Sequence, residues 1–400
     1  MQHADQVAYL ERMLTMVRTN TRDDGPGVSH TPVEEYFDPV RYQREVALLF
    51  RKYPIVVAYS GQVRKAGDFV VHNDTGQPIL VVRGTDGILR AFLNVCRHRS
   101  ASVEVKPCGS NKRAFVCPYH GWSYDLTGRL VGITDGAAFG DVDRSKHGLR
   151  RLKVVEKYGL VWAVPTALED GEDASLDIDS YLGPLQFDLS GWDMQDWELH
   201  SSVPVRPRMN WKLVIDTFLE LYHFRYLHPG TVFPLFLDNI ATYERLDRHI
   251  RLSAAKRTLT ELEGQPKETW RILDHAIVIY QLFPNTVLAY TQDHCGVFTS
   301  FPVSPDESVM HFSVLVSPEE KAKKPDSYWK ANVDLFATAL VEDFGIGETI
   351  QKNFPTGANR QQTFGKFEKA LGWYHREVEA AITGASTEAF PLRPSATSPL

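Results

Sequence analysis

Two short pairs of cysteine and histidine constrain this chain more than any other feature. Cys96 and His98 are separated by one residue, Cys117 and His120 by two, and eighteen residues lie between the pairs. Each pair can project two ligands from a single loop, and thiolate together with imidazole suits iron or zinc. The sequence therefore predicts a metal centre that is held between two hairpin tips.

The order of the ligands distinguishes an iron site from a zinc site. A zinc finger normally uses pairs of like ligands, whereas a Rieske [2Fe–2S] cluster has two cysteines on one iron and two histidines on the other. The segments CRHRS and CPYHGWSYDLTGRL resemble the two cluster loops of Rieske non-haem iron oxygenases. A structural zinc site is kept as the alternative. Cys108 and Cys295 belong to neither pair and are interpreted as free thiols.

A second motif, NWKLVIDTFLELYHFRYLHPGT, carries His223 and His228 five positions apart. This spacing misses the i, i+4 face of a helix, so both rings reach one ion only if the helix predicted over 210–226 loosens between them. Pro229 and Gly230 supply an end to that helix. Two imidazoles and one carboxylate would form the facial triad of non-haem Fe(II) oxygenases, which leaves positions open for O₂ and substrate.

The same segment resembles the catalytic helix of Rieske oxygenase α subunits. The resemblance implies a third iron ligand on a C-terminal helix, and the segment LVEDFGIGETIQKNF matches that element with Asp343 at the ligand position. Glu342 and Asp334 are the alternatives.

The acid three positions before the first histidine is Glu220. The resemblance implies that it bridges His223 to a cluster histidine of a neighbouring subunit, by motif position His120. Oxygenases that act on quaternary amines such as carnitine are among those with Glu at this position. Apolar residues beside the triad could wall a substrate pocket or simply pack the core; they are Phe218, Leu219, Phe224, Leu227, Phe233 and Phe236.

Short β-rich runs fill the stretch from about 53 to 164, and later strands are grouped between helices, which favours an α+β protein over a doubly wound sheet. The resemblance implies an all-β Rieske domain over 46–165 and a catalytic domain over 166–385. That second domain is expected to be a helix-grip (START-like) fold, with an antiparallel sheet flanked by helices. Residues 1–45 are expected to form a helix and linker packing on the catalytic domain, and 386–400 a flexible tail.

Composition removes several other classes of protein. The 400 residues carry a net charge of −6, so there is no positive field to hold a nucleic acid or an anionic membrane. The longest stretch without charged residues or histidine, 276–292, is interrupted by Gln, Pro and Asn and does not predict a membrane span. No secretory signal is visible at the N-terminus, so we expect a cytoplasmic protein.

The resemblance implies the terminal oxygenase component of a Rieske system. Electrons from NAD(P)H would arrive through a separate flavin and iron–sulfur reductase or a ferredoxin, and O₂ would be used to mono- or cis-dihydroxylate a small organic substrate. An aromatic substrate, as in aromatic hydrocarbon catabolism, is the first expectation, and oxidation of N-methyl, quaternary amine or O-methyl groups is the second. A homotrimer, with or without a small β subunit, is implied. An electron-transfer Rieske protein and a zinc-stabilised binding protein remain as rivals.

Overall fold

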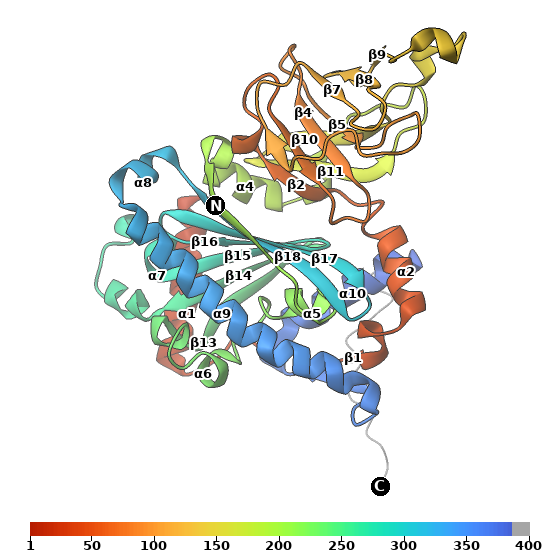
Figure 1. Cartoon of the computed structure of the whole chain (residues 1–400). Coiled ribbons are helices and arrows are strands. Elements are labelled where there is room, and N and C mark those ends of the chain that lie inside the picture. Colours follow the sequence, from red (N-terminus) through yellow and green to blue (C-terminus); the bar gives the residue numbers. More distant parts are fainter. Residues whose placement is uncertain (386–400) are drawn as a thin grey trace. The chain divides into compact units, whose positions relative to one another are not determined.

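The computed structural model describes residues 1–385 and divides into two compact units (Figure 1). One unit contains residues 50–181 and 193–199, and the other contains 1–49, 182–192 and, of the described residues, 200–385. The tail predicted over 386–400 lies outside the described residues. Within 1–385, no helix is both long and apolar enough to cross a membrane.

The unit built on 50–181 is mainly β-structure. Its larger sheet has the order β2-β11-β10-β5-β4-β3-β6, and a small sheet has the order β7-β8-β9. The strands of both sheets are β2 (Ile55–Tyr59), β3 (Phe69–His72), β4 (Ile79–Arg83), β5 (Leu89–Leu93), β6 (Cys108–Gly109), β7 (Ala114–Val116), β8 (Ser123–Asp125), β9 (Leu130–Gly132), β10 (Arg151–Lys157) and β11 (Leu160–Ala167).

The other unit is built on a seven-stranded sheet with the order β12-β18-β17-β16-β15-β14-β13. Successive strands from β13 to β18 pair antiparallel. The strands are β12 (Glu198–Val205), β13 (Phe236–Leu246), β14 (His249–Lys256), β15 (Ala276–Leu282), β16 (Thr286–Tyr290), β17 (His294–Ser304) and β18 (Glu307–Val316). β15 and β16 are buried at every position, which explains why they read as apolar runs without alternation.

Helices flank this sheet, and the longest, α9 (Asp326–Asn353), runs across it in Figure 1. Its 28 residues correspond to about 42 Å of helix. The prediction of an α+β protein with an antiparallel sheet flanked by helices is confirmed. The remaining helices and short strands of the unit are α1 (His3–Thr19), β1 (Ser29–Pro32), α2 (Pro39–Leu48), α4 (Leu185–Trp192), α5 (Trp211–Asp216), α6 (Phe224–Leu227), α7 (Ile272–His275), α8 (Pro318–Lys323), β19 (Gln361–Phe364) and α10 (Lys369–Thr383).

A buried ion pair fixes α5, the helix that leads into the histidine motif. Lys212 Nζ on α5 donates to both carboxylate oxygens of Glu45 on α2, at 2.8 and 2.9 Å. The indole of Trp211 and the guanidinium of Arg41 donate to the same carboxylate. The side chains of Lys212 and Glu45 are 0% and 1% exposed, so each charge depends on the other for compensation.

We expect Glu45→Ala to lower the free energy of unfolding by about 3–5 kcal/mol, because it leaves the Lys212 ammonium buried without its counter-ion. Urea unfolding followed by tryptophan fluorescence measures this loss. The matched control is Glu379→Ala, which removes a more exposed carboxylate that also pairs with Arg41, at 2.6 Å, and should cost about 1 kcal/mol or less. Equal losses in the two variants would show that the buried pair does not hold α5.

Candidate metal centres

The two predicted cluster loops have the same backbone geometry. In the first, the amide of Ser100 donates to the carbonyl of Cys96, and the amide of Cys96 donates to the carbonyl of Ala101. In the second, Gly121 and Trp122 make the equivalent bonds with Cys117. The residue four positions after each cysteine has a positive φ, 63° at Ser100 and 71° at Gly121. The two loops therefore present their ligand pairs in related ways.

Buried side chains connect the first loop to the core of its unit. The hydroxyl of Tyr124 accepts a hydrogen bond from the amide of Arg97 at 2.9 Å and lies 3.3 Å from the sulfur of Cys96. The amide side chain of Asn94 bonds to the backbone of Val103 and Glu104. Both Tyr124 and Asn94 are almost fully buried, so the first loop is fixed at both of its ends.

The two cysteines and the two histidines among the candidate cluster ligands differ in burial. Cys96 and Cys117 are buried and belong to the same hydrophobic core cluster. His98 and His120 are half-buried with ring centroids 4.7 Å apart, and His98 stacks on Trp122 at 5.0 Å. Nδ1 of His98 is buried and has no hydrogen-bond partner among the described residues. Sulfurs on the core side and imidazoles toward the surface match a centre with two cysteines on one iron and two histidines on the other.

A single zinc ion fits these four residues poorly. Tetrahedral zinc holds its ligands about 2.0–2.3 Å away, so any two ligand atoms lie within about 4.6 Å of each other. Among residues 1–385, the one group of three or more such side chains with all ligand atoms within 4.8 Å is His223, His228 and Asp343. The wider arrangement of the cysteines and histidines suits a two-iron cluster. Burial raises the pKa of the Cys117 thiol, and the neighbouring Cys96 side chain raises it further.

The histidine motif does not form the single helix that its sequence predicts over 210–226. α5 ends at Asp216, and helical structure resumes only in α6, with His223 and His228 as the residues flanking this one turn. The carboxylate of Glu220 accepts the backbone amides of Tyr222 and His223. The break in the helix therefore lies before His223, and not between the two histidines as expected. At this break, the Glu220 carboxylate supplies the hydrogen bonds that a continuous helix would have made.

α9 brings Asp343 to the histidines. Gln351, two turns further along α9, accepts the amide of Asn210 at 3.0 Å and donates to the carbonyl of Tyr36 at 3.0 Å. Asn210 is in turn the N-cap of α5, where its side chain accepts the amide of Lys212. These buried contacts join the start of the histidine motif to the helix that carries the acid.

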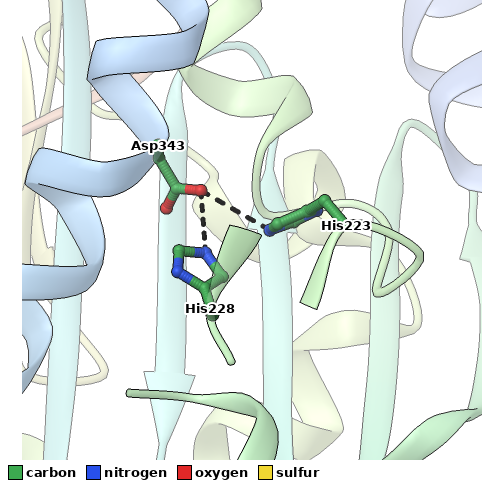
Figure 2. A group of neighbouring side chains, drawn as sticks. All are labelled: His223, His228 and Asp343. Atoms are coloured by element: carbon green, nitrogen blue, oxygen red, sulfur yellow. Dashed lines mark hydrogen bonds and ion pairs between the residues drawn. The ribbon is translucent and has the colours of Figure 1, made fainter. Parts of the chain in front are cut away.

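One carboxylate oxygen of Asp343 contacts both imidazoles, as the dashed lines in Figure 2 show. Its Oδ1 is 3.0 Å from Nε2 of His228 and 3.5 Å from Nε2 of His223. Nε2 of His223 is buried and has no hydrogen-bond partner among the described residues. Three ligand atoms thus converge on one point, with the geometry that a mononuclear metal ion needs.

Each of these histidines has a second carboxylate on its other nitrogen. Nδ1 of His223 contacts Oε1 of Glu220, and Nδ1 of His228 lies 2.6 Å from Oε2 of Glu342. Glu342 also accepts the Thr231 hydroxyl at 2.7 Å. Carboxylates in this position fix the ring and keep Nε2 available for a metal. From the sequence, Glu342 is expected only as an alternative ligand; its position next to Asp343 gives no signal for this contact.

The site is electrostatically suited to a cation. Burial alone would lower the pKa of His223, but the carboxylates of Glu220 and Asp343 outweigh it and raise that pKa. For His228, burial is likewise outweighed by Asp343 and Glu342, so its pKa is raised as well. A field that favours a proton on these rings also favours a metal ion between them.

A cavity of about 470 Å³ opens beside the three residues, between the sheet and α9. Of the six apolar residues expected to wall a pocket, Phe218, Phe224 and Phe236 line it, and the other three do not. Sequence reasoning did not find the wall supplied by β17 and α9, where Phe298 and Phe336 have ring centroids 5.9 Å apart. The pattern that could have indicated it is the i, i+4, i+7 spacing of Phe336, Leu340 and Asp343 along α9.

Comparisons with known proteins match two domain families along the chain. Residues 53–148 match the Rieske [2Fe–2S] domain, and residues 194–384 match the catalytic domain of the ring-hydroxylating alpha subunit. The carnitine monooxygenase oxygenase subunit of Escherichia coli K12 is 28% identical over 341 residues, which is 83% of this chain and 86% of that protein. The alpha subunit of biphenyl 2,3-dioxygenase from Rhodococcus jostii is 29% identical over 194 residues, covering 47% of this chain and 41% of that one.

The fold is also that of a solved quaternary ammonium Rieske monooxygenase, described for carnitine oxidation by gut microbiota and for inter-subunit electron transfer. The two structures align with a TM-score of 0.74 at 20% identity, over 90% of this chain and 96% of that one.

A Rieske-type unit together with a ring-hydroxylating catalytic unit defines an iron-dependent oxygenase. The chain belongs to the Rieske non-haem iron oxygenases, as their α, or terminal oxygenase, subunit. Proteins of this family contain a Rieske [2Fe–2S] cluster and a mononuclear iron, and they take electrons from a reductase or ferredoxin to oxidise a small substrate with O₂.

Proposed function

We propose that Cys96, His98, Cys117 and His120 hold the Rieske cluster of this oxygenase, and that His223, His228 and Asp343 hold its iron. The convergence of Nε2 of both histidines with Oδ1 of Asp343 carries the second assignment. When bound, the iron would supply reductive activation of O₂. The chain itself contributes three ligands and two carboxylates that hold the rings in place.

The reaction we propose is hydroxylation of a small organic substrate in the cavity beside the iron ligands. The wall of phenylalanines and aliphatic side chains excludes water and holds an apolar group next to the triad. Mono- or cis-dihydroxylation of an aromatic substrate is the leading form of this proposal. The second is oxidation of an N-methyl or quaternary amine substrate; Glu220 and the carnitine monooxygenase relative favour it.

We further propose a homotrimer in which Glu220 connects His223 to His120 of the partner subunit. Glu220 is suited to the bridge because it already contacts Nδ1 of His223. Large apolar side chains are exposed beside both centres, at Val116 (55%) and Tyr119 (56%) near the cluster loops and at Tyr222 (52%) and Tyr226 (74%) near the triad. Such residues mark surfaces that a partner covers.

The test begins with protein purified without oxygen. We expect about three irons and two sulfides per chain, the sum of one cluster and one ion, and a brown colour. The holoprotein is then assayed with a surrogate reductase against matched arenes, methyl ethers and N-methyl amines, with O₂ uptake and product mass as the measurements. A gain of one oxygen, a gain of two, or release of formaldehyde distinguishes the proposed reactions. Stoichiometric zinc without sulfide, or no substrate-coupled O₂ uptake across the panel, would contradict the function.

A further inference from the structure

The cavity beside the triad has a second polar region, which the oxygenase chemistry above does not use. We call it the distal end; it consists of Lys256, Thr291, Asp293, His294 and Tyr328, all of which line the cavity. Its place follows from α9, because Tyr328 and Asp343 both line the cavity and lie fifteen residues apart on that helix. Fifteen residues span about 22 Å of helix. The Tyr328 hydroxyl contacts Asp293, which in turn contacts His294, so the distal end lies along α9 away from the iron ligands.

Lys256 brings a positive charge to the distal end that no contact ion pair neutralises. Its Nζ donates to the carbonyl of Leu273 at 2.6 Å, and within residues 1–385 no carboxylate oxygen lies within 4.0 Å of it. The two nearby acids have partners of their own. Asp274 accepts from the Gln292 amide at 2.7 Å, and Asp293 pairs with Lys324. Burial lowers the pKa of Lys256, with Asp274 and Asp293 opposing it. A cation in such a place ordinarily has a counter-ion.

His294 supplies a second unused group. The side chain is 2% exposed, and its Nδ1 lies 2.6 Å from Oδ1 of Asp293 and 2.9 Å from the Thr291 hydroxyl. Asp293 is itself held by Lys324 and by the hydroxyl of Tyr328. The ring is thus fixed by one nitrogen, while Nε2 is buried with no hydrogen-bond partner among the described residues. Buried polar atoms of native proteins are rarely left in this state.

We propose, on the basis of the oxygenase function above, that the distal end binds the carboxylate of an elongated organic acid. Lys256 pairs with the carboxylate, and a water bridges the carboxylate to Nε2 of His294, which accepts because the Nδ1 proton is directed at Asp293. One unpaired lysine balances one negative charge, which fits a carboxylate better than a doubly charged phosphate. The apolar body of the acid lies along Phe298 and Phe336, which line the cavity between its two ends.

This placement also fixes which part of the acid is oxidised. The carboxylate is held at one end of the cavity, and the iron ligands are at the other. The carbon that reacts is therefore remote from the carboxylate, at the opposite terminus of the molecule. A substrate too short to span the cavity would be held away from the triad.

Calorimetry on the holoprotein with 4-phenylbutanoate and 4-phenylbutanamide tests the site. The two probes share a shape and differ in charge. We expect the carboxylate to bind at least about tenfold more tightly than the amide, as is usual for a charge-assisted hydrogen bond. Lys256→Met should abolish the preference and Lys256→Arg should keep it. Lys330→Met is the matched control, since Lys330 lies on the solvent side of α9 and pairs with Asp334.

Equal affinity for the two probes, binding of neither, or a preference that survives Lys256→Met would overturn the proposal. Circular dichroism and thermal unfolding of the holoprotein show that each variant is folded, and Lys256→Gln replaces the methionine variant, under the same criterion, if either changes. Because binding is measured without turnover, the two proposals fail separately. An active oxygenase without the preference removes only the carboxylate site, and carboxylate binding by a protein that consumes no O₂ removes only the oxygenase function.

Discussion

Asp343→Ala is expected to release the mononuclear iron and reduce turnover by more than about 100-fold, while the brown cluster remains. The loss should exceed the roughly 10- to 100-fold effect of removing an outer carboxylate, because Asp343 is the one acid within residues 1–385 whose oxygen lies near Nε2 of both histidines. Iron per chain should fall from about three to about two with sulfide unchanged. Metal analysis, visible absorption and O₂ uptake measure the three quantities.

Asp334→Ala is the matched control for this experiment. Asp334 lies on the same helix and was an alternative ligand on sequence grounds, but its side chain is exposed and pairs with Lys330. We expect full iron content and full activity in this variant. If the Asp334 variant lost its iron and the Asp343 variant kept it, Asp334 and not Asp343 would be the iron ligand.

Glu220→Gln is expected to leave both metals bound and yet reduce turnover to the limit of detection. Orientation of His223 alone would account for a loss of about 10- to 100-fold. Interruption of electron transfer to the iron accounts for the remainder. The measurements are metal content, O₂ uptake and the rate at which the reduced cluster is reoxidised by O₂ in the presence of substrate.

Glu342→Gln separates these two effects, because Glu342 holds His228 as Glu220 holds His223. Only Glu220 is proposed to bridge to the partner subunit. The Glu342 variant should therefore lose about 10- to 100-fold in turnover, with normal reoxidation of the cluster once iron is saturated. If both variants lose activity equally and reoxidise at the same rate, Glu220 is a positioning residue and not an electron bridge.

The cluster loops were accessible from sequence because their ligands come in local pairs. Cys96 with His98 and Cys117 with His120 each lie on one tight loop, so the spacing alone carries the geometry. What the spacing does not show is the positive φ at Ser100, since serine rarely adopts it and nothing in the sequence marks it.

The triad was less accessible, because its acid lies more than a hundred residues from the histidines. Acids on exposed helix faces are common, and only the resemblance to a family selected Asp343. The contact between Gln351 and Asn210 that brings α9 to α5 joins two residues with no local signal. For the same reason the helix predicted over 210–226 was too long: the capping by Glu220 that interrupts it depends on a side-chain orientation that helical periodicity does not record.

α9 is one uninterrupted helix, and this continuity has a mechanical consequence. A helix resists compression along its axis, so a displacement at Tyr328 is transmitted to Asp343 with little loss. Tyr328 at the distal end and Asp343 beside the histidines therefore belong to one rigid element. A molecule too small to contact both Tyr328 and Asp343 would leave this helix in place.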